Sequence, residues 1–220
     1  MARPTLKERT VTVLMERYGE TYADELSISV DRNTPSPLFR LLCAALLFSA
    51  RIRAEAATTA ARALSRQGWT TPRNMAASTW EERTLTLNEN GYARYDERTA
   101  RMLGDTAQKL LDEYGGDLRR LRDAADHDPD EERRRLKAFK GIGDVGVDIF
   151  FREVQIAWEE HYPFVDKTAA KAAERLGLPK RAKTLSGLVE RDEFPRLVAA
   201  LVRAELANAY EDIKAEAKAR

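Results

Sequence analysis

Cysteine is nearly absent from the sequence, which holds one, Cys43, among 220 residues. One thiol cannot form an intramolecular disulfide, a cysteine-rich zinc site or a cysteine-ligated iron–sulfur cluster. Because Cys43 lies in the apolar stretch 41–46, we expect a buried thiol that packs as a small apolar side chain. The two histidines, His127 and His161, lie far apart in the sequence. A metal cluster is therefore not expected.

Long apolar runs and an excess of charge are also missing. The longest apolar run, residues 41–48, is far shorter than a membrane span. The first residues lack the apolar core of a signal peptide, so we predict a cytoplasmic, nucleoid-associated protein with no membrane partner. Lys and Arg number 37 against 36 Asp and Glu, a net charge of +1. Binding to nucleic acid would have to rest on local clusters of basic residues.

Apolar residues recur at helical spacing, and no segment shows the alternation typical of a strand. We predict an all-α fold with about ten or more short helices. Ser36 and Pro37 are predicted as the N-cap and first residue of a helix that is apolar nearly all round, and therefore central. The helix predicted at 144–158 has the same character. Ser78 and Glu81 predict a capping box for another helix.

Two glycines, Gly141 and Gly143, flank Ile142 between two predicted helices. Glycine adopts positive φ without steric cost, and Ile142 would anchor the turn in the core. The first of the two helices carries a predicted N-cap, Asp128, followed by Pro129. Unpaired amides at the start of the second helix, with the helix dipole behind them, suit a phosphate group. The pattern is that of a helix-hairpin-helix, which can hold a nucleic-acid backbone without reading its sequence.

Further residues around this turn carry a resemblance to a known family. Leu136 and Phe139 precede the turn 141–143, and Val165 and Asp166 follow the second helix. In this order, they resemble the helix-hairpin-helix DNA glycosylases of the endonuclease III superfamily. Residues 41–51 and 91–102 are also similar to segments of that family.

The resemblance implies two helical domains flanking a DNA cleft. A six-helix barrel with the hairpin would span residues 31–160. Residues 1–30 and 161–220 would form a discontinuous second domain without an iron–sulfur cluster. The protein would act as a monomer on damaged double-stranded DNA.

The resemblance gives Asp166 the catalytic role. Its carboxylate would stabilise the positive charge that develops on the sugar as the N-glycosidic bond of a flipped base breaks. The alternative is that Asp166 only caps the helix that begins at Lys167, and one group can do both. Val145 occupies the position of the family's Schiff-base lysine and cannot act as a nucleophile. We therefore expect a glycosylase of the monofunctional type, without lyase activity.

Several residues are expected to contact DNA. They are Lys140, Gly141, Ile142 and Gly143 of the hairpin, with Arg51, Arg94 and Arg98 from the other two similar segments. Asp144 follows Gly143 and would weaken the hold on a phosphate. Alternatively, the backbone carbonyls of Gly141 and Gly143 hold a monovalent cation, as in members of the family. Tyr92, Tyr95 and Trp80 could stack on a base or belong to the core.

Two other functions fit the same residues. The missing lysine, the near-neutral charge and Asp144 also suit a non-catalytic protein that binds DNA lesions or unusual DNA structures on this scaffold. A helical interaction protein that has lost DNA binding is the third alternative. No cofactor is expected for any of them.

Overall fold

Every regular element in the computed structural model, which describes residues 4–220, is a helix or a helical turn. The all-α prediction is confirmed. The chain divides into two compact units. The central unit is Ala23–Glu160, and the terminal unit combines Met1–Tyr22 with His161–Arg220. The short helix α2 (Tyr22–Glu25) contains the first point at which the chain passes between them. None of the described helices combines the length and the apolarity needed to cross a lipid bilayer.

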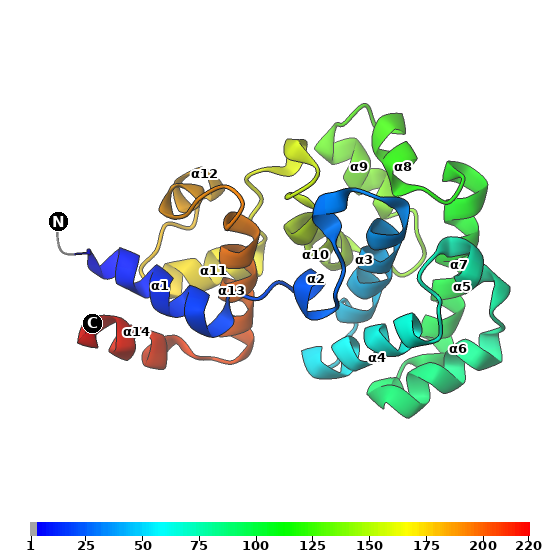
Figure 1. Cartoon of the computed structure of the whole chain (residues 1–220), viewed down its shortest axis with the longest axis horizontal. Coiled ribbons are helices and arrows are strands. Elements are labelled where there is room, and N and C mark those ends of the chain that lie inside the picture. Colours follow the sequence, from blue (N-terminus) through cyan, green and yellow to red (C-terminus); the bar gives the residue numbers. More distant parts are fainter. Residues whose placement is uncertain (1–3) are drawn as a thin grey trace. The chain divides into compact units, whose positions relative to one another are not determined.

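The central unit is arranged around one apolar helix. Its helices are α3 (Pro35–Phe48), α4 (Ala54–Arg66), α5 (Pro72–Ala77), α6 (Trp80–Leu87), α7 (Asp96–Tyr114), α8 (Leu118–Ala124), α9 (Pro129–Leu136) and α10 (Asp144–Val154). Helix α3 lies among α4, α8 and α10 (Figure 1). Its residues Leu38–Leu47 are all buried except Arg40, and α10 is buried over most of its length. Each leucine so buried contributes roughly 1.5–3 kcal/mol. The central place predicted for both helices is confirmed.

Two predicted helix starts are wrong by one or two residues. Helix α3 begins at Pro35 with Thr34 as its N-cap, while the Ser36 hydroxyl donates to the Thr70 carbonyl at 2.9 Å. Helix α6 uses Thr79 and Glu82 as its capping box in place of Ser78 and Glu81. Residues one or two positions apart offered the same cap chemistry in both places, so the local pattern could not choose between them.

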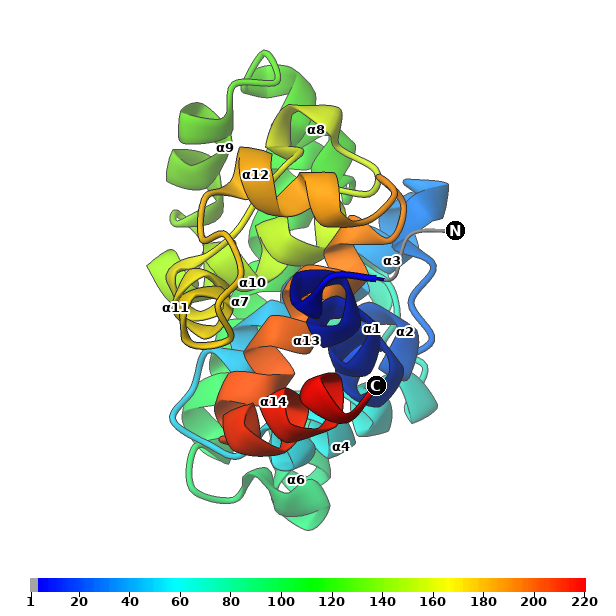
Figure 2. The same ribbon diagram turned by 90° about the vertical axis from the view of Figure 1, so that its left-hand side faces the viewer.

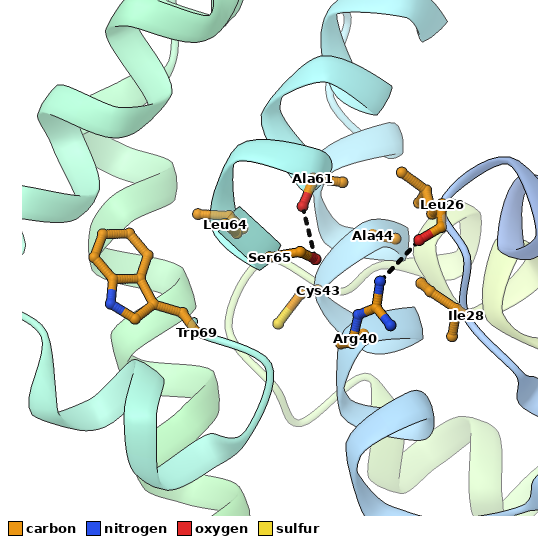
Figure 3. Close-up of a pocket in the computed structure, with 9 residues that line it drawn as sticks. All are labelled: Leu26, Ile28, Arg40, Cys43, Ala44, Ala61, Leu64, Ser65 and Trp69. Carbon is orange, nitrogen blue, oxygen red and sulfur yellow. Dashed lines mark hydrogen bonds between the residues drawn. The ribbon is translucent and has the colours of Figure 1, made fainter. Parts of the chain in front are cut away.

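Cys43 lies on α3 beside a cavity of about 10 Å³, no larger than one water molecule (Figure 3). Cys43 is 5% exposed, so the predicted buried cysteine is confirmed, and burial raises the pKa of its thiol. Across the cavity, the Arg40 guanidinium donates to the Leu26 carbonyl at 2.8 Å.

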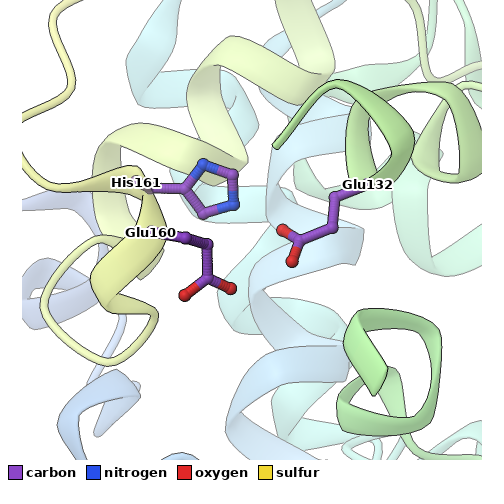
Figure 4. A group of neighbouring side chains, drawn as sticks. All are labelled: Glu132, Glu160 and His161. Atoms are coloured by element: carbon purple, nitrogen blue, oxygen red, sulfur yellow. The ribbon is translucent and has the colours of Figure 1, made fainter. Parts of the chain in front are cut away.

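A pair of acidic residues, Glu132 of α9 and Glu160 at the end of the central unit, is drawn in Figure 4. Glu132 is fully buried, and burial together with its hydrogen bond to Glu160 raises the pKa of its carboxyl group. Burial alone would also raise the pKa of Glu160, but hydrogen bonds from Arg122 lower it. Both oxygens of Glu160 accept from Arg122 at 2.6 Å. The hydrogen bond between Glu132 and Glu160 and the ion pair of Glu160 with Arg122 link α8, α9 and the residues after α10.

The terminal unit has its own core. Its helices are α1 (Leu6–Tyr18), α11 (Lys167–Arg175), α12 (Ala182–Leu185), α13 (Phe194–Leu206) and α14 (Tyr210–Ala219). Helix α1 packs against α13 and α14, and α11 packs against α13 (Figure 2). Leu14, Leu197, Leu201 and Ile213 are fully buried within this unit.

Tyr92 fastens the end of α3 to the turn before α7. The ring is fully buried, and its hydroxyl donates to the Leu47 carbonyl at 2.8 Å. Burial raises the pKa of Tyr92 to about 12, so the donor keeps its proton at neutral pH. The bond holds two loops in place, residues 49–53 after α3 and 93–95 before α7.

Tyr92→Phe removes this donor and leaves the buried Leu47 carbonyl without it. The free energy of unfolding should fall by about 1–3 kcal/mol. Tyr95→Phe is the matched control, because the half-buried Tyr95 hydroxyl has no hydrogen bond among residues 4–220. Urea denaturation of both variants measures the difference, and equal losses would contradict the role given to the Tyr92 hydroxyl.

Candidate nucleic-acid interface

The hairpin lies between α9 and α10. Asp128 caps α9, accepting from the Glu131 amide at 2.8 Å, with Pro129 as the first helical residue, as predicted. After α9, Phe139 and Ile142 are 1% and 4% exposed. Both apolar residues of the turn are therefore inserted in the core, and the glycines are left at the surface.

The two hairpin glycines serve different purposes. Gly141 has φ +92°, and a Cβ at this position would clash with the Met102 sulfur. Gly143 has φ −101° and is the N-cap of α10, and a Cβ there would meet nothing within 4 Å. The first amides of α10 have no acceptor within their own helix and begin beside this open space. A phosphate group could approach them closely.

Charged side chains surround the same turn. Asp144, the first residue of α10, has its carboxylate 2.8 Å from the Lys137 ammonium and 3.8 Å from Arg133. Arg133 also pairs with Asp148 at 2.7 Å, and Lys140 pairs with Asp105 at 3.2 Å. The acid expected to repel a phosphate is therefore offset by neighbouring cations.

Three segments far apart in the sequence meet around one cavity of about 290 Å³ in the central unit. Gly141 of the hairpin lies on one side and Arg51, after α3, on another. Helix α7 and the residue before it supply the third side, with Tyr95, Arg98, Thr99 and Met102. The structure thus brings together three of the segments that the sequence marked as DNA contacts.

A second, more open hollow of about 470 Å³ adjoins the start of α7. Its lining residues are Arg94, Tyr95, Asp96, Glu97, Arg98 and Arg101. The Arg94 guanidinium lies over the Tyr95 ring, 5.3 Å from its centroid. The Asp96 carboxylate accepts from Asn88 at 2.6 Å and from the Glu97 amide at 2.7 Å.

Many arginines of the central unit have an acid or a carbonyl as partner, but the four that line the cavity and the second hollow do not. Arg119 pairs with Asp117 and Arg122 with Glu160, both at 2.6 Å. Four arginines line the cavity and the second hollow with exposed side chains that form no ion pair and no hydrogen bond within the described residues. These four, named here the arginine cluster, are Arg51, Arg94, Arg98 and Arg101. With Asp96 and Glu97 as the acids among the lining residues, positive charge prevails at these hollows although the net charge of the chain is only +1.

The three aromatic residues that could stack on a base, Tyr92, Tyr95 and Trp80, differ in their surroundings. Tyr92 is fully buried, so of the two roles left open for it, the place in the core is confirmed. The indole N–H of Trp80 donates to the Glu97 carbonyl at 3.0 Å. Tyr95 alone of the three lines the hollows.

Asp166 belongs to the terminal unit and is the N-cap of α11. One carboxylate oxygen accepts from the Thr168 amide at 2.8 Å and from the Ala169 amide at 3.1 Å. The residue is 5% exposed. The predicted capping role is confirmed, and these two bonds fix the carboxylate's orientation.

A monovalent cation at the hairpin stays a prediction. The Gly143 carbonyl accepts from the Val147 amide at 3.0 Å, as the carbonyl of an N-cap normally does. A carbonyl oxygen has a second lone pair, so this bond leaves Gly143 able to act as a ligand.

No protein-family model and no curated protein matches the sequence. Solved structures do match it. One is a trapped covalent intermediate of endonuclease III with DNA, an estranged-adenine complex, at 21% identity and a TM-score of 0.50 over 76% of this chain and 73% of that one. Another is a non-covalent endonuclease III–DNA complex, at 21% identity and a TM-score of 0.51 over 76% of this chain and 72% of that one. The fold is that of endonuclease III. At this identity the likeness extends to the fold alone.

Some lining residues of the cavity were missed in the sequence. Ser49 and Ala50 follow α3 directly, and Thr99 and Met102 lie on α7. Tyr95, Arg98, Thr99 and Met102 have the spacing i, i+3, i+4, i+7 of one helix face, which was a usable signal. The contact between Met102 and Gly141 left no signal in the sequence, because it depends on tertiary packing.

Gly141→Ala should cost more stability than Gly143→Ala. The first variant combines an unfavourable φ with the Met102 clash, for a loss of about 1–3 kcal/mol. At Gly143 the backbone is extended and the space is open, so the loss should stay below about 1 kcal/mol. Chemical denaturation measures both losses, and a larger loss for Gly143→Ala would show that the turn is described incorrectly.

Proposed function

We propose that this protein is a DNA repair glycosylase of the monofunctional type that binds damaged double-stranded DNA. The central unit would hold the DNA backbone through the hairpin amides and the arginine cluster. Asp166 would assist hydrolysis of the N-glycosidic bond of a flipped base. The endonuclease III fold, known from DNA complexes of that protein, supports the proposal.

The arginine cluster is the observation that carries the proposal. Four exposed guanidinium groups line two hollows, one of which is also lined by the hairpin glycine Gly141. Guanidinium groups without an acidic partner attract the phosphates of DNA, and their binding releases the counterions that these phosphates hold. Tyr95, half-buried between the hollows, adds an aromatic face on which an unpaired base can stack.

The chemistry proposed for Asp166 needs an ionised carboxylate held in a fixed position. Two backbone N–H donors hold its carboxylate in place, and 5% exposure shields it from bulk water. Such a carboxylate stabilises a developing positive charge on the sugar more strongly than an exposed one would. Val145, which is 60% exposed, has no amine with which to form a Schiff base. Water is therefore the proposed nucleophile.

A non-catalytic lesion-binding protein is the second candidate. Val145 favours it, and so does the full use of one Asp166 oxygen as a helix cap. It shares the DNA-binding surface with the first candidate and differs in base release. A screen of duplexes with different damaged bases for free base separates the two.

Removing a single arginine of the cluster should weaken DNA binding in a salt-dependent way. For Arg51→Ala and Arg98→Ala we expect the slope of log affinity against log salt to decrease in magnitude by about 1 each. Arg119→Ala is the matched control, because Arg119 is held by Asp117 at 2.6 Å. Fluorescence anisotropy with a duplex that contains an abasic-site analogue measures the slopes. Identical slopes for all three variants would contradict the proposed interface. No binding by the unmodified protein would also contradict it and would favour an interaction protein.

Asp166→Asn should abolish base release and leave stability and DNA affinity nearly unchanged. Asparagine caps a helix as well as aspartate does but carries no charge. Asp166→Ala should also lose about 1 kcal/mol of stability, because it removes the cap. Single-turnover release of free base from the substrate found in the screen is the measurement. Unchanged release by Asp166→Asn would exclude the catalytic role.

A further inference from the structure

Lys137 lies at the hairpin but is not among the contacts proposed above. It is the C-cap residue of α9, and its ammonium group lies 2.8 Å from the Asp144 carboxylate. The two side chains are 43% and 69% exposed. An ion pair this open to water contributes little to stability, so its partners exchange readily.

Arg133, the other cation beside Asp144, is held much more firmly. Its guanidinium pairs with Asp148 at 2.7 Å and lies over the Phe151 ring, 5.1 Å from the centroid. It reaches Asp144 at 3.8 Å and is 28% exposed. Because Asp148 and Phe151 fix Arg133, this cation stays beside Asp144 even when Lys137 turns away.

The place where a phosphate would meet the hairpin is next to this pair. Asp144 is the first residue of α10, directly after the open Gly143. Lys137 contacts Asp144, so its ammonium group is adjacent to the same helix start. In the free protein, the Asp144 carboxylate is the anion that pairs with the Lys137 ammonium group.

We propose that Lys137 is a further phosphate-binding residue. When a nucleic-acid phosphodiester approaches the start of α10, Lys137 exchanges the Asp144 carboxylate for the phosphate. Arg133 remains with Asp144 and limits its repulsion of the phosphate. The inference rests on the proposed binding of DNA and adds to it a residue and an exchange of ion-pair partners.

The first test compares Lys137→Ala with Arg134→Ala. Arg134 is on the same helix, 69% exposed and paired with Glu131 at 2.6 Å, so its removal also deletes one paired, exposed cation. For Lys137→Ala, we expect about a tenfold loss of affinity for an abasic-analogue duplex at about 0.1 M salt and a salt slope smaller by about 1. Arg134→Ala should leave both unchanged. Thermal midpoints of the two variants should agree, which excludes loss of folding as the cause.

The second test is a double-mutant cycle with Asp144→Asn. Alone, Asp144→Asn should raise the affinity several-fold, because it removes the anion that pairs with Lys137. In the Lys137→Ala background, the same change should raise the affinity less, because no ion pair remains to be broken. Equal gains in the two backgrounds would overturn the exchange of partners.

The outcomes separate the inference from the function on which it rests. If Arg98→Ala weakens DNA binding and Lys137→Ala does not, the inference is overturned and the proposed function stands. Absence of DNA binding by the unmodified protein overturns both. The inference is supported if Lys137→Ala loses DNA affinity while Arg134→Ala does not, and if Asp144→Asn raises the affinity less in the Lys137→Ala background.

Discussion

The packing of α3 against α10 is the contact on which the rest of the central unit depends. Both helices are buried over most of their length. Their packing therefore fixes the position of the end of α3 and of the start of α10. The end of α3 leads into the loop that carries Arg51, and the start of α10 is the hairpin. Tyr92 then holds the turn before α7 to the Leu47 carbonyl. One apolar contact therefore positions three polar segments around a single cavity.

Net charge is a poor guide to the surface of this molecule. Many of its cations are paired with acids, as Arg122 is with Glu160 and Arg133 with Asp148. The members of the arginine cluster lack such partners and line two neighbouring hollows of the central unit. Local potential, which acts over about a Debye length, is what a phosphate backbone meets. A near-neutral chain can thus present a locally basic surface.

The sequence was informative where local chemistry decides the structure. The all-α class, the Asp128–Pro129 helix start, the capping role of Asp166 and the burial of Cys43 follow from periodicity and cap preference. The predicted starts of α3 and α6 were wrong because a residue one or two positions away had equal capping ability. Tyr92 and Met102 could not be placed, because only tertiary packing separates a buried ring from an exposed one. The pairing of Asp144 with Lys137 likewise depends on the hairpin geometry.

Amide chemical-shift mapping tests the central claim most directly, because it observes binding at each residue without altering the protein. The unmodified protein would be titrated with a short duplex that contains an abasic-site analogue. The account predicts shifts concentrated at Gly143 and Val145 of the hairpin, in the loop that carries Arg51, and from Arg94 to Met102. Shifts absent from these segments at saturating DNA, or confined to the helices of the terminal unit, would contradict it.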